Sequence, residues 1–100
     1  MEMSKMAKIS DLSADSKEVE IEAKVVEVLD PRTVNTRFGP KQVAIAVIED
    51  DTGRINLNLW EDQIEKVKKA KTVKIEGGYV TVWKDAMQLN VGRQGKLETE

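Results

Sequence analysis

Hydrophobic residues alternate with polar ones along several short segments of this 100-residue chain, and this period of two constrains the fold more than any other feature. Successive side chains of a β-strand point to opposite faces, so an alternating segment predicts a strand with one buried face. The clearest case covers residues 19–29 and ends at Asp30-Pro31, because proline donates no ladder hydrogen bond. Its apolar face consists of Val19, Ile21, Ala23 and Val25. The chain is therefore expected to fold mainly into β-sheet.

Four further segments predict strands, at residues 42–49, 54–60, 73–83 and 86–91. The first of them is apolar on both faces, which is typical of a central strand covered on both sides. Residues 61–71 predict a helix, because acids gather at its start and lysines at its end, as the helix dipole favours. Gly77-Gly78 predicts a bend or bulge, after which Val80 and Val82 return to the core face.

This order of three strands, one helix and two strands favours an all-β fold, a five-stranded Greek-key OB-fold barrel with one short helix between strands 3 and 4. A chain of this length makes one domain. We expect the OB-fold domain over residues 9–97, a flexible N-terminus at 1–8 and a flexible C-terminus at 98–100. Residues 32–40 are expected to form a loop, and the polar residues 92–100 are expected to fray.

The chain contains no cysteine and no histidine. Disulfides, zinc ribbons, iron–sulfur clusters and thiol nucleophiles need cysteine, and histidine is the commonest general base and metal ligand. We therefore expect no enzyme, no metal and no cofactor, and we interpret the acids Glu49, Asp50 and Asp51 as a solvated turn. The sequence has no run of about 18 apolar residues, so no membrane span is expected.

The four aromatic residues of the chain are Phe38, Trp60, Tyr79 and Trp83. The strand register keeps three of them out of the core. If Leu57 and Leu59 face inward, Trp60 faces outward, and if the valines of the strand at 73–83 face inward, Tyr79 and Trp83 face outward. A cluster of exposed aromatic rings marks an interaction site. For the loop residue Phe38, stacking on a ligand and packing under its own loop both stay open.

An aromatic platform beside cations is how proteins bind single-stranded nucleic acid without sequence preference. Amide side chains on the neighbouring strands can reach base edges, and cations can reach phosphates. Residues 32–41 carry three cations and no acid, although the formal net charge of the chain is −2. The expected nucleic-acid-binding residues are Trp60, Tyr79, Trp83, Lys84, Arg37, Phe38, Arg32, Lys41, Arg54, Asn56, Asn58, Gln88, Asn90 and Arg93.

Two stretches of the chain resemble a known family. Residues 50–60 read DDTGRINLNLW and residues 73–84 read VKIEGGYVTVWK. Both are similar to the single-OB-fold single-stranded DNA-binding proteins related to replication protein A, found in archaea and in the human single-stranded-DNA sensor complex. The similarity extends over residues 8–97. One departure is Asp85, where the family usually has glycine.

The resemblance implies that an aromatic triad stacks on bases, here Trp60, Tyr79 and Trp83, and that Lys84 contacts phosphate. It further implies a protein that shields single-stranded DNA during DNA replication and repair, together with other replication or repair proteins. Such a protein is expected to be a monomer without membrane contact, cytoplasmic and associated with the nucleoid.

Two alternative functions stay open at this point. An RNA- or tRNA-binding OB domain would use the same aromatic platform, and competition between RNA and DNA would separate it. A protein-interaction OB module of a replication protein A-like complex would dock a peptide or a subunit on the exposed rings. The acidic balance of the chain favours this second alternative, and salt dependence would separate it, because phosphate binding weakens steeply with salt.

Overall fold

The computed structural model describes residues 7–100, with the side chains of Arg93 and Gln94 outside the described part. A 3-10 helix, η1 (Ile9–Asp11), comes first, and one α-helix, α1 (Asp62–Lys68), joins β4 to β5. The six strands are β1 (Val19–Val28), β2 (Arg32–Thr36), β3 (Gly39–Asp50), β4 (Gly53–Trp60), β5 (Thr72–Trp83) and β6 (Ala86–Thr99).

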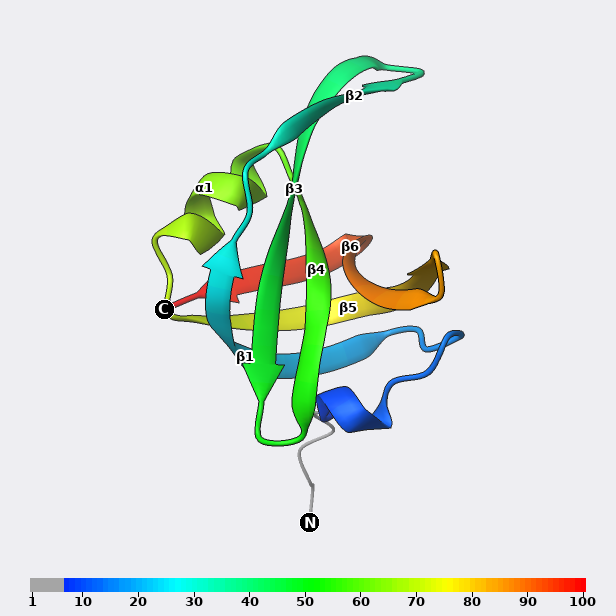
Figure 1. Ribbon diagram of the computed structural model, residues 1–100, viewed down its shortest axis with the longest axis vertical. Helices are drawn as coiled ribbons and strands as arrows, with labels where there is room; N and C mark the ends of the chain where they lie inside the picture. Colours follow the sequence, from blue (N-terminus) through cyan, green and yellow to red (C-terminus); the bar gives the residue numbers. More distant parts are fainter. Residues whose placement is uncertain (1–6) are drawn as a thin grey trace.

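Five of the strands close into a barrel (Figure 1). The sheet order is β1-β5-β6-β4-β3-β2, and a further pairing of β1 with β3 joins the ends of the five-strand ring. The pairs are antiparallel except for β4 with β6, which run parallel over three residue pairs. This arrangement confirms the predicted five-stranded OB-type barrel, with α1 between its third and fourth strands and shorter than the predicted 61–71.

The core of the barrel is aliphatic. The six isoleucine and leucine side chains with no or nearly no exposed surface are Ile21, Ile48, Leu57, Leu59, Ile75 and Leu89. Burying each contributes roughly 1.5–3 kcal/mol. The predicted inward register of β4 is confirmed, whereas the prediction for Val82 is wrong, because this side chain is 50% exposed. Val82 lies beyond Gly78, the last β5 residue paired with β1, where the β5–β6 hairpin extends past the barrel wall.

The strand β6 is longer than the sequence predicted. Residues 92–99, expected to fray, continue the strand and pair with the beginning of β5, from Val73↔Thr99 to Glu76↔Lys96. The predicted bulge at the glycine pair is confirmed by a register shift between Glu76 and Gly78. Here the two strands approach so closely that a Cβ on Gly92 would lie 2.6 Å from the carbonyl oxygen of Gly77.

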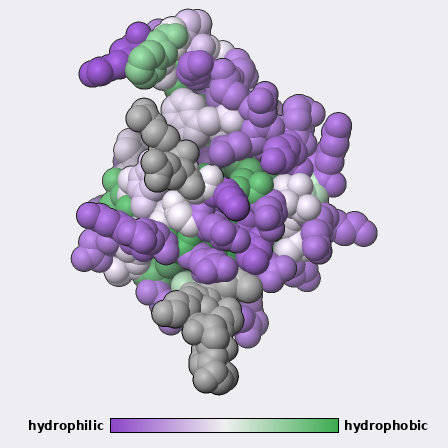
Figure 2. Space-filling model, turned by 180° about the vertical axis from the view of Figure 1, so that it is seen from behind, coloured by the Kyte–Doolittle hydropathy of each residue, from purple (hydrophilic) through white to green (hydrophobic). Residues whose placement is uncertain are grey.

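The segment expected to be a loop is a β-hairpin that projects from the barrel (Figures 1 and 2). Its strands pair from Arg32↔Val43 to Thr36↔Gly39, and we call residues 32–42 the arm. Gly39 at its tip has φ +106°, a conformation that side-chain-bearing residues rarely adopt. Both faces of the arm meet solvent over much of its length, so its sequence lacks the one-sided apolar pattern that predicts a strand.

The turn between β3 and β4 anchors the N-terminal segment. Asp50 accepts hydrogen bonds from the backbone N–H of Ile9 (2.8 Å) and from the N–H and hydroxyl of Thr52 (2.7 and 2.6 Å). Lys8 forms an ion pair with Asp51 at 3.0 Å. The predicted turn is present, and the half-buried Asp50 has in addition a structural role that the sequence did not show. Of the N-terminus expected to be flexible, residues 1–6 lie outside the described residues.

Candidate nucleic-acid interface

The aromatic residues lie on the outer side of the barrel and on the arm. Trp60 is 42% exposed, Tyr79 40%, Trp83 53% and Phe38 77%. Trp60 ends β4 and Trp83 ends β5, so both rings lie where a strand leaves the barrel wall. The buried cluster that fills the barrel consists of aliphatic residues. The rings are therefore available to a ligand without loss of the core.

Two of the rings share one hollow with an arm cation. Trp60, Trp83 and Arg32 all line a hollow of about 190 Å³ on the outer face of β3 and β4. A second hollow of about 200 Å³ shares Arg32 and Asn58 with the first and adds Leu29 and Asp30. We call the two hollows together the groove. Its complete lining is Leu29, Asp30, Arg32, Val34, Val43, Ala44, Ile45, Asn58, Trp60, Trp83 and Gln88.

Amide side chains of neighbouring strands form a hydrogen-bonded network beside the rings. Asn58 donates through Nδ2 to the side-chain oxygens of Gln88 (3.0 Å) and Asn90 (2.9 Å). Asn90 in turn donates to the hydroxyl of Thr81 (3.1 Å) and is 9% exposed. Asn56 follows on the same face and lies opposite Gln88 in the register. Because both Nδ2 hydrogens of Asn58 are used, its Oδ1 is the atom of that amide left to accept from a base.

Lys84 lies over the ring of Trp83, with its Nζ 4.6 Å from the ring centroid. This cation–π contact is worth about 0.5–1 kcal/mol at an exposed site. The β5–β6 turn brings the two residues together, since Lys84 and Asp85 have φ of 52° and 66°. Asp tolerates this left-handed conformation better than most residues, which explains how it replaces the usual glycine. The predicted contact of Lys84 with phosphate would require this cation to leave the ring face.

Tyr79 does not share the groove with the tryptophans. It lies opposite Asn90 in the β5–β6 register and lines a different hollow, of about 330 Å³, with residues 15–18. The three rings of the predicted triad thus occupy one side of the β5–β6 hairpin and the end of β4, but the structure brings only Trp60 and Trp83 to the same hollow.

The predicted cations differ in their surroundings. Arg32 lines the groove, whereas Arg37 is exposed near the tip of the arm. The neighbouring Phe38 is also exposed and does not pack under the hairpin. Arg54 lies at the opposite end of β4 from Trp60, and its Nε is 2.7 Å from a carboxylate oxygen of Glu49. Lys41 pairs with Glu61 at 3.8 Å. Arg93 belongs to β6, but its side chain lies outside the described part of the chain.

The sequence prediction missed the aliphatic floor of the groove. Residues 42–49 were expected to be covered on both sides, but only the Ala44, Ala46 and Ile48 face packs into the core. On the other face, Val43 and Ile45 line the groove. The sequence showed correctly that both faces of this strand are apolar. It did not show that the second face lines a groove instead of packing against another layer of protein.

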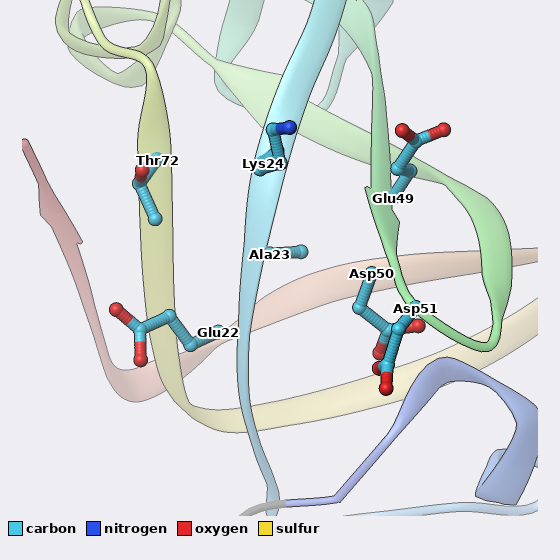
Figure 3. A pocket seen from close by; sticks show the side chains of 7 residues that line it. All are labelled: Glu22, Ala23, Lys24, Glu49, Asp50, Asp51 and Thr72. Atoms are coloured by element: carbon cyan, nitrogen blue, oxygen red, sulfur yellow. The ribbon is translucent and has the colours of Figure 1, made fainter.

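Other hollows carry acids. One of about 420 Å³ is lined by Glu22, Lys24, Glu49, Asp50, Asp51 and two uncharged residues. Figure 3 shows β1 running through it, between Thr72 on one side and the acids of the β3–β4 turn on the other. Another, of about 460 Å³, contains Glu61, Asp62 and Glu65. Both are larger than either half of the groove, but their carboxylates would repel phosphates.

Within residues 7–100, no cluster of three or more acidic side chains is arranged to hold a metal ion. The same part of the chain has no helix long and apolar enough to cross a membrane.

Comparisons with known proteins find relatives that match nearly the whole chain. A family model described as "Single-stranded DNA binding protein Ssb-like, OB fold" matches residues 12–99. The chain is 31% identical over 90 residues to the single-stranded DNA binding protein Ssb of Saccharolobus solfataricus, covering 90% of this chain and 61% of the relative. It is 37% identical over 98 residues to replication factor A of Methanothermobacter thermautotrophicus, covering 91% of this chain and 12% of that protein.

A solved structure has the same fold. The OB domain of Ta0387 from Thermoplasma acidophilum superposes with a TM-score of 0.79 at 24% identity, covering 95% of this chain and 86% of that one. The curated relatives are longer than the matched region, since the chain spans 61% of the first and 12% of the second.

Proposed function

The chain belongs to the Ssb-like family of OB-fold single-stranded DNA-binding proteins, and we propose on this premise that it binds single-stranded DNA in the groove with little sequence preference. The observation that carries the proposal is that Trp60, Trp83 and Arg32 line one hollow while the aliphatic core is complete without them. Such binding would protect exposed strands during DNA replication and repair.

In the proposed mechanism, bases stack on the rings of Trp60 and Trp83. Stacking is worth roughly 1–3 kcal/mol per base and tolerates any sequence, because every base has a π-face. The aliphatic floor formed by Val43 and Ile45 would meet the rest of the base, and the amide network would meet its polar edge. Tyr79, which precedes Trp83 on the same strand β5, would stack a further base of the nucleic acid.

Phosphates would lie towards the cations at the rim. Arg32 shares a hollow with the two tryptophans, and Arg37 extends this positive charge along the arm. Lys84 would exchange its contact with Trp83 for a phosphate. The acidic hollow beside the β3–β4 turn, at the other end of β4 from Trp60, would keep the backbone of the nucleic acid within the groove. Arg54 contributes little in this scheme, because Glu49 already neutralises it.

Binding of a fluorescein-labelled dT oligonucleotide, followed by anisotropy between low and high salt, tests the proposal. We expect log Kd to change linearly with log salt, with a slope of about 0.7 for each phosphate neutralised. Unlabelled DNA, RNA of matched sequence and duplex DNA serve as competitors. No binding, or binding insensitive to salt, would contradict the proposal in favour of a protein partner. Stronger competition by RNA than by DNA would point to the RNA-binding alternative.

A further inference from the structure

We propose that Glu61 is a positioning residue for single-stranded DNA, whose carboxylate fixes the point where the arm leaves the barrel. The inference rests on the function proposed above. Glu61 directly follows Trp60 and is the N-cap residue of α1. It therefore stands between the aromatic end of β4 and the helix, next to the base of the arm.

Strand β3 changes its partner at this place. Val43 is the last β3 residue paired with β4, where it lies opposite Trp60, and it is also paired with Arg32 of β2. From Gln42 towards the tip, the strand pairs with β2 and belongs to the arm. The bonds made at Gln42 consequently set the angle between the arm and the groove.

Glu61 makes three contacts with this junction. The backbone N–H of Gln42 donates to Oε2 of Glu61 at 3.1 Å, and the N–H of Glu61 donates to the carbonyl of Gln42 at 3.0 Å. The Nζ of Lys41 lies 3.8 Å from Oε1 of the same carboxylate. The carboxylate of Glu61 thus accepts from the backbone N–H of Gln42, where the arm meets the barrel, and pairs with the neighbouring Lys41.

The backbone conformation of Glu61 adds to this interpretation. Its φ of 51° and ψ of −117° lie in a region that residues with a side chain rarely adopt, because the conformation is strained. Such a conformation persists when surrounding contacts hold it, and here the contacts to Gln42 and Lys41 do so. On the other flank, the N–H of Trp60 donates to Oε1 of Gln63 at 2.9 Å. The same short segment therefore holds the backbone of Trp60 as well as the base of the arm.

The negative charge of Glu61 should weaken DNA binding, whereas its hydrogen bond to Gln42 should strengthen it. A carboxylate at the rim of a groove for DNA repels phosphates and competes with them for Lys41. Two variants separate the effects, because both remove the charge and keep a side chain at the same φ. Glu61→Gln retains an oxygen that can accept from Gln42, whereas Glu61→Ala retains none.

The affinity of the whole chain for a dT oligonucleotide, measured by anisotropy, compares these two variants with the wild type. We expect Glu61→Ala to bind the oligonucleotide about fivefold more weakly than Glu61→Gln. The reason is that the arm of Glu61→Ala would occupy the binding orientation about a fifth of the time, and the apparent affinity falls by the same factor as that occupancy. Glu61→Gln should bind at least as tightly as the wild type. Its salt slope should be steeper by about 0.7, since Lys41 then turns to a phosphate without leaving an unpaired carboxylate.

Glu65→Gln is the matched control. Glu65 lies on the next turn of α1 and lines the same acidic hollow as Glu61. Its substitution therefore measures the effect of one lost negative charge alone. Hydrogen exchange of the Gln42 amide without DNA gives a second measurement, and it should be faster in Glu61→Ala than in Glu61→Gln or the wild type. The amide of Leu57, inside the barrel, should exchange at the same rate in all of them if the variants are folded.

The outcomes distinguish the two proposals. If the wild type binds the oligonucleotide while Glu61→Ala and Glu61→Gln have equal affinities, the positioning role is overturned and the proposed function stands. If the wild type does not bind, the proposed function fails and the positioning role for DNA fails with it. Slower exchange of the Gln42 amide in Glu61→Gln than in Glu61→Ala, together with the expected affinities, supports the role.

Discussion

The two faces of β4 and β5 differ in the side chains they carry and in their contact with water. On the inner face, Leu57, Leu59 and Ile75 are completely buried. On the outer face, Trp60 and Trp83 are 42% and 53% exposed, although large rings contribute most when they are buried. The inner face therefore supports the fold, and the proposed function assigns base stacking to the outer face. Substitutions on the two faces should therefore have separable effects.

The largest expected effect is on stability and comes from the inner face. Leu57→Ala should lower the free energy of unfolding by about 2–5 kcal/mol, because it leaves a cavity in a tightly packed core. Urea denaturation followed by circular dichroism measures this loss. The fraction that remains folded should bind a dT oligonucleotide with unchanged affinity. A change in affinity at full folding would show that the two faces are coupled.

On the outer face, the expected effect is on binding. Trp60→Ala and Trp83→Ala should each weaken binding of the oligonucleotide by roughly 1–3 kcal/mol, the value of one stacked base. Their unfolding free energies should stay within about 0.5 kcal/mol of the wild type, as for other surface substitutions. Val82→Ala is the control, since Val82 is also exposed and directly precedes Trp83. A marked loss of stability in either tryptophan variant would mean that its ring supports the fold.

The β3–β4 turn should affect stability alone, because it lies at the other end of β4 from Trp60. Asp50→Ala removes the acceptor for Ile9 and Thr52 and should cost about 1 kcal/mol of unfolding free energy. Burial raises the pKa of Asp50, but the hydrogen bonds from Thr52 and Ile9 outweigh it and hold the pKa below its ordinary value.

The lowered pKa of Asp50 also gives the sign of the pH dependence. Its contribution to stability is complete above the ordinary carboxyl pKa and is lost as the pH falls through the lowered value of the folded protein. The difference in unfolding free energy between the wild type and Asp50→Ala should therefore shrink in acid. A difference that stays constant with pH would exclude this carboxylate as the anchor of the N-terminal segment.

The smallest expected effect concerns the rim of the groove. Arg32→Ala should reduce the salt slope of oligonucleotide binding by about 0.7, the share of one phosphate on a single strand. Lys69→Ala removes a cation at the end of α1 and serves as a charge-matched control that should leave the slope unchanged. Equal slopes in the two variants would place the phosphates elsewhere than beside Arg32.

The alternation of residues was sufficient to predict the barrel and the outward position of the tryptophans. In β4, the period of two separates Leu57 and Leu59 from Trp60 without any knowledge of the partner strands. The same rule failed for Val82, because whether an inward position is covered depends on how far the neighbouring strand extends. Local pattern therefore determines the face of a residue, but the non-local pairing determines its burial.

The arm and the end of β6 could not be predicted for a related reason. The arm pairs through residues that are largely exposed, and the end of β6 has a single apolar residue, Leu97, that packs against the core. Neither segment therefore has a run of alternating apolar residues. The ion pairs of Lys41 with Glu61 and of Arg54 with Glu49 could not be predicted either, because the folding of the chain brings these side chains together. Residue type suggested phosphate contacts for all of these cations, whereas the structure distinguishes Arg32 from those already paired.

Tryptophan fluorescence during titration with a dT oligonucleotide tests most directly whether the outer face stacks bases. In Trp60→Phe the emission comes from Trp83 alone, and in Trp83→Phe from Trp60 alone, because the chain has two tryptophans. We predict strong quenching in both variants, with the same midpoint as the anisotropy change and an affinity that falls with salt. Binding seen by anisotropy without quenching of either tryptophan would contradict the account.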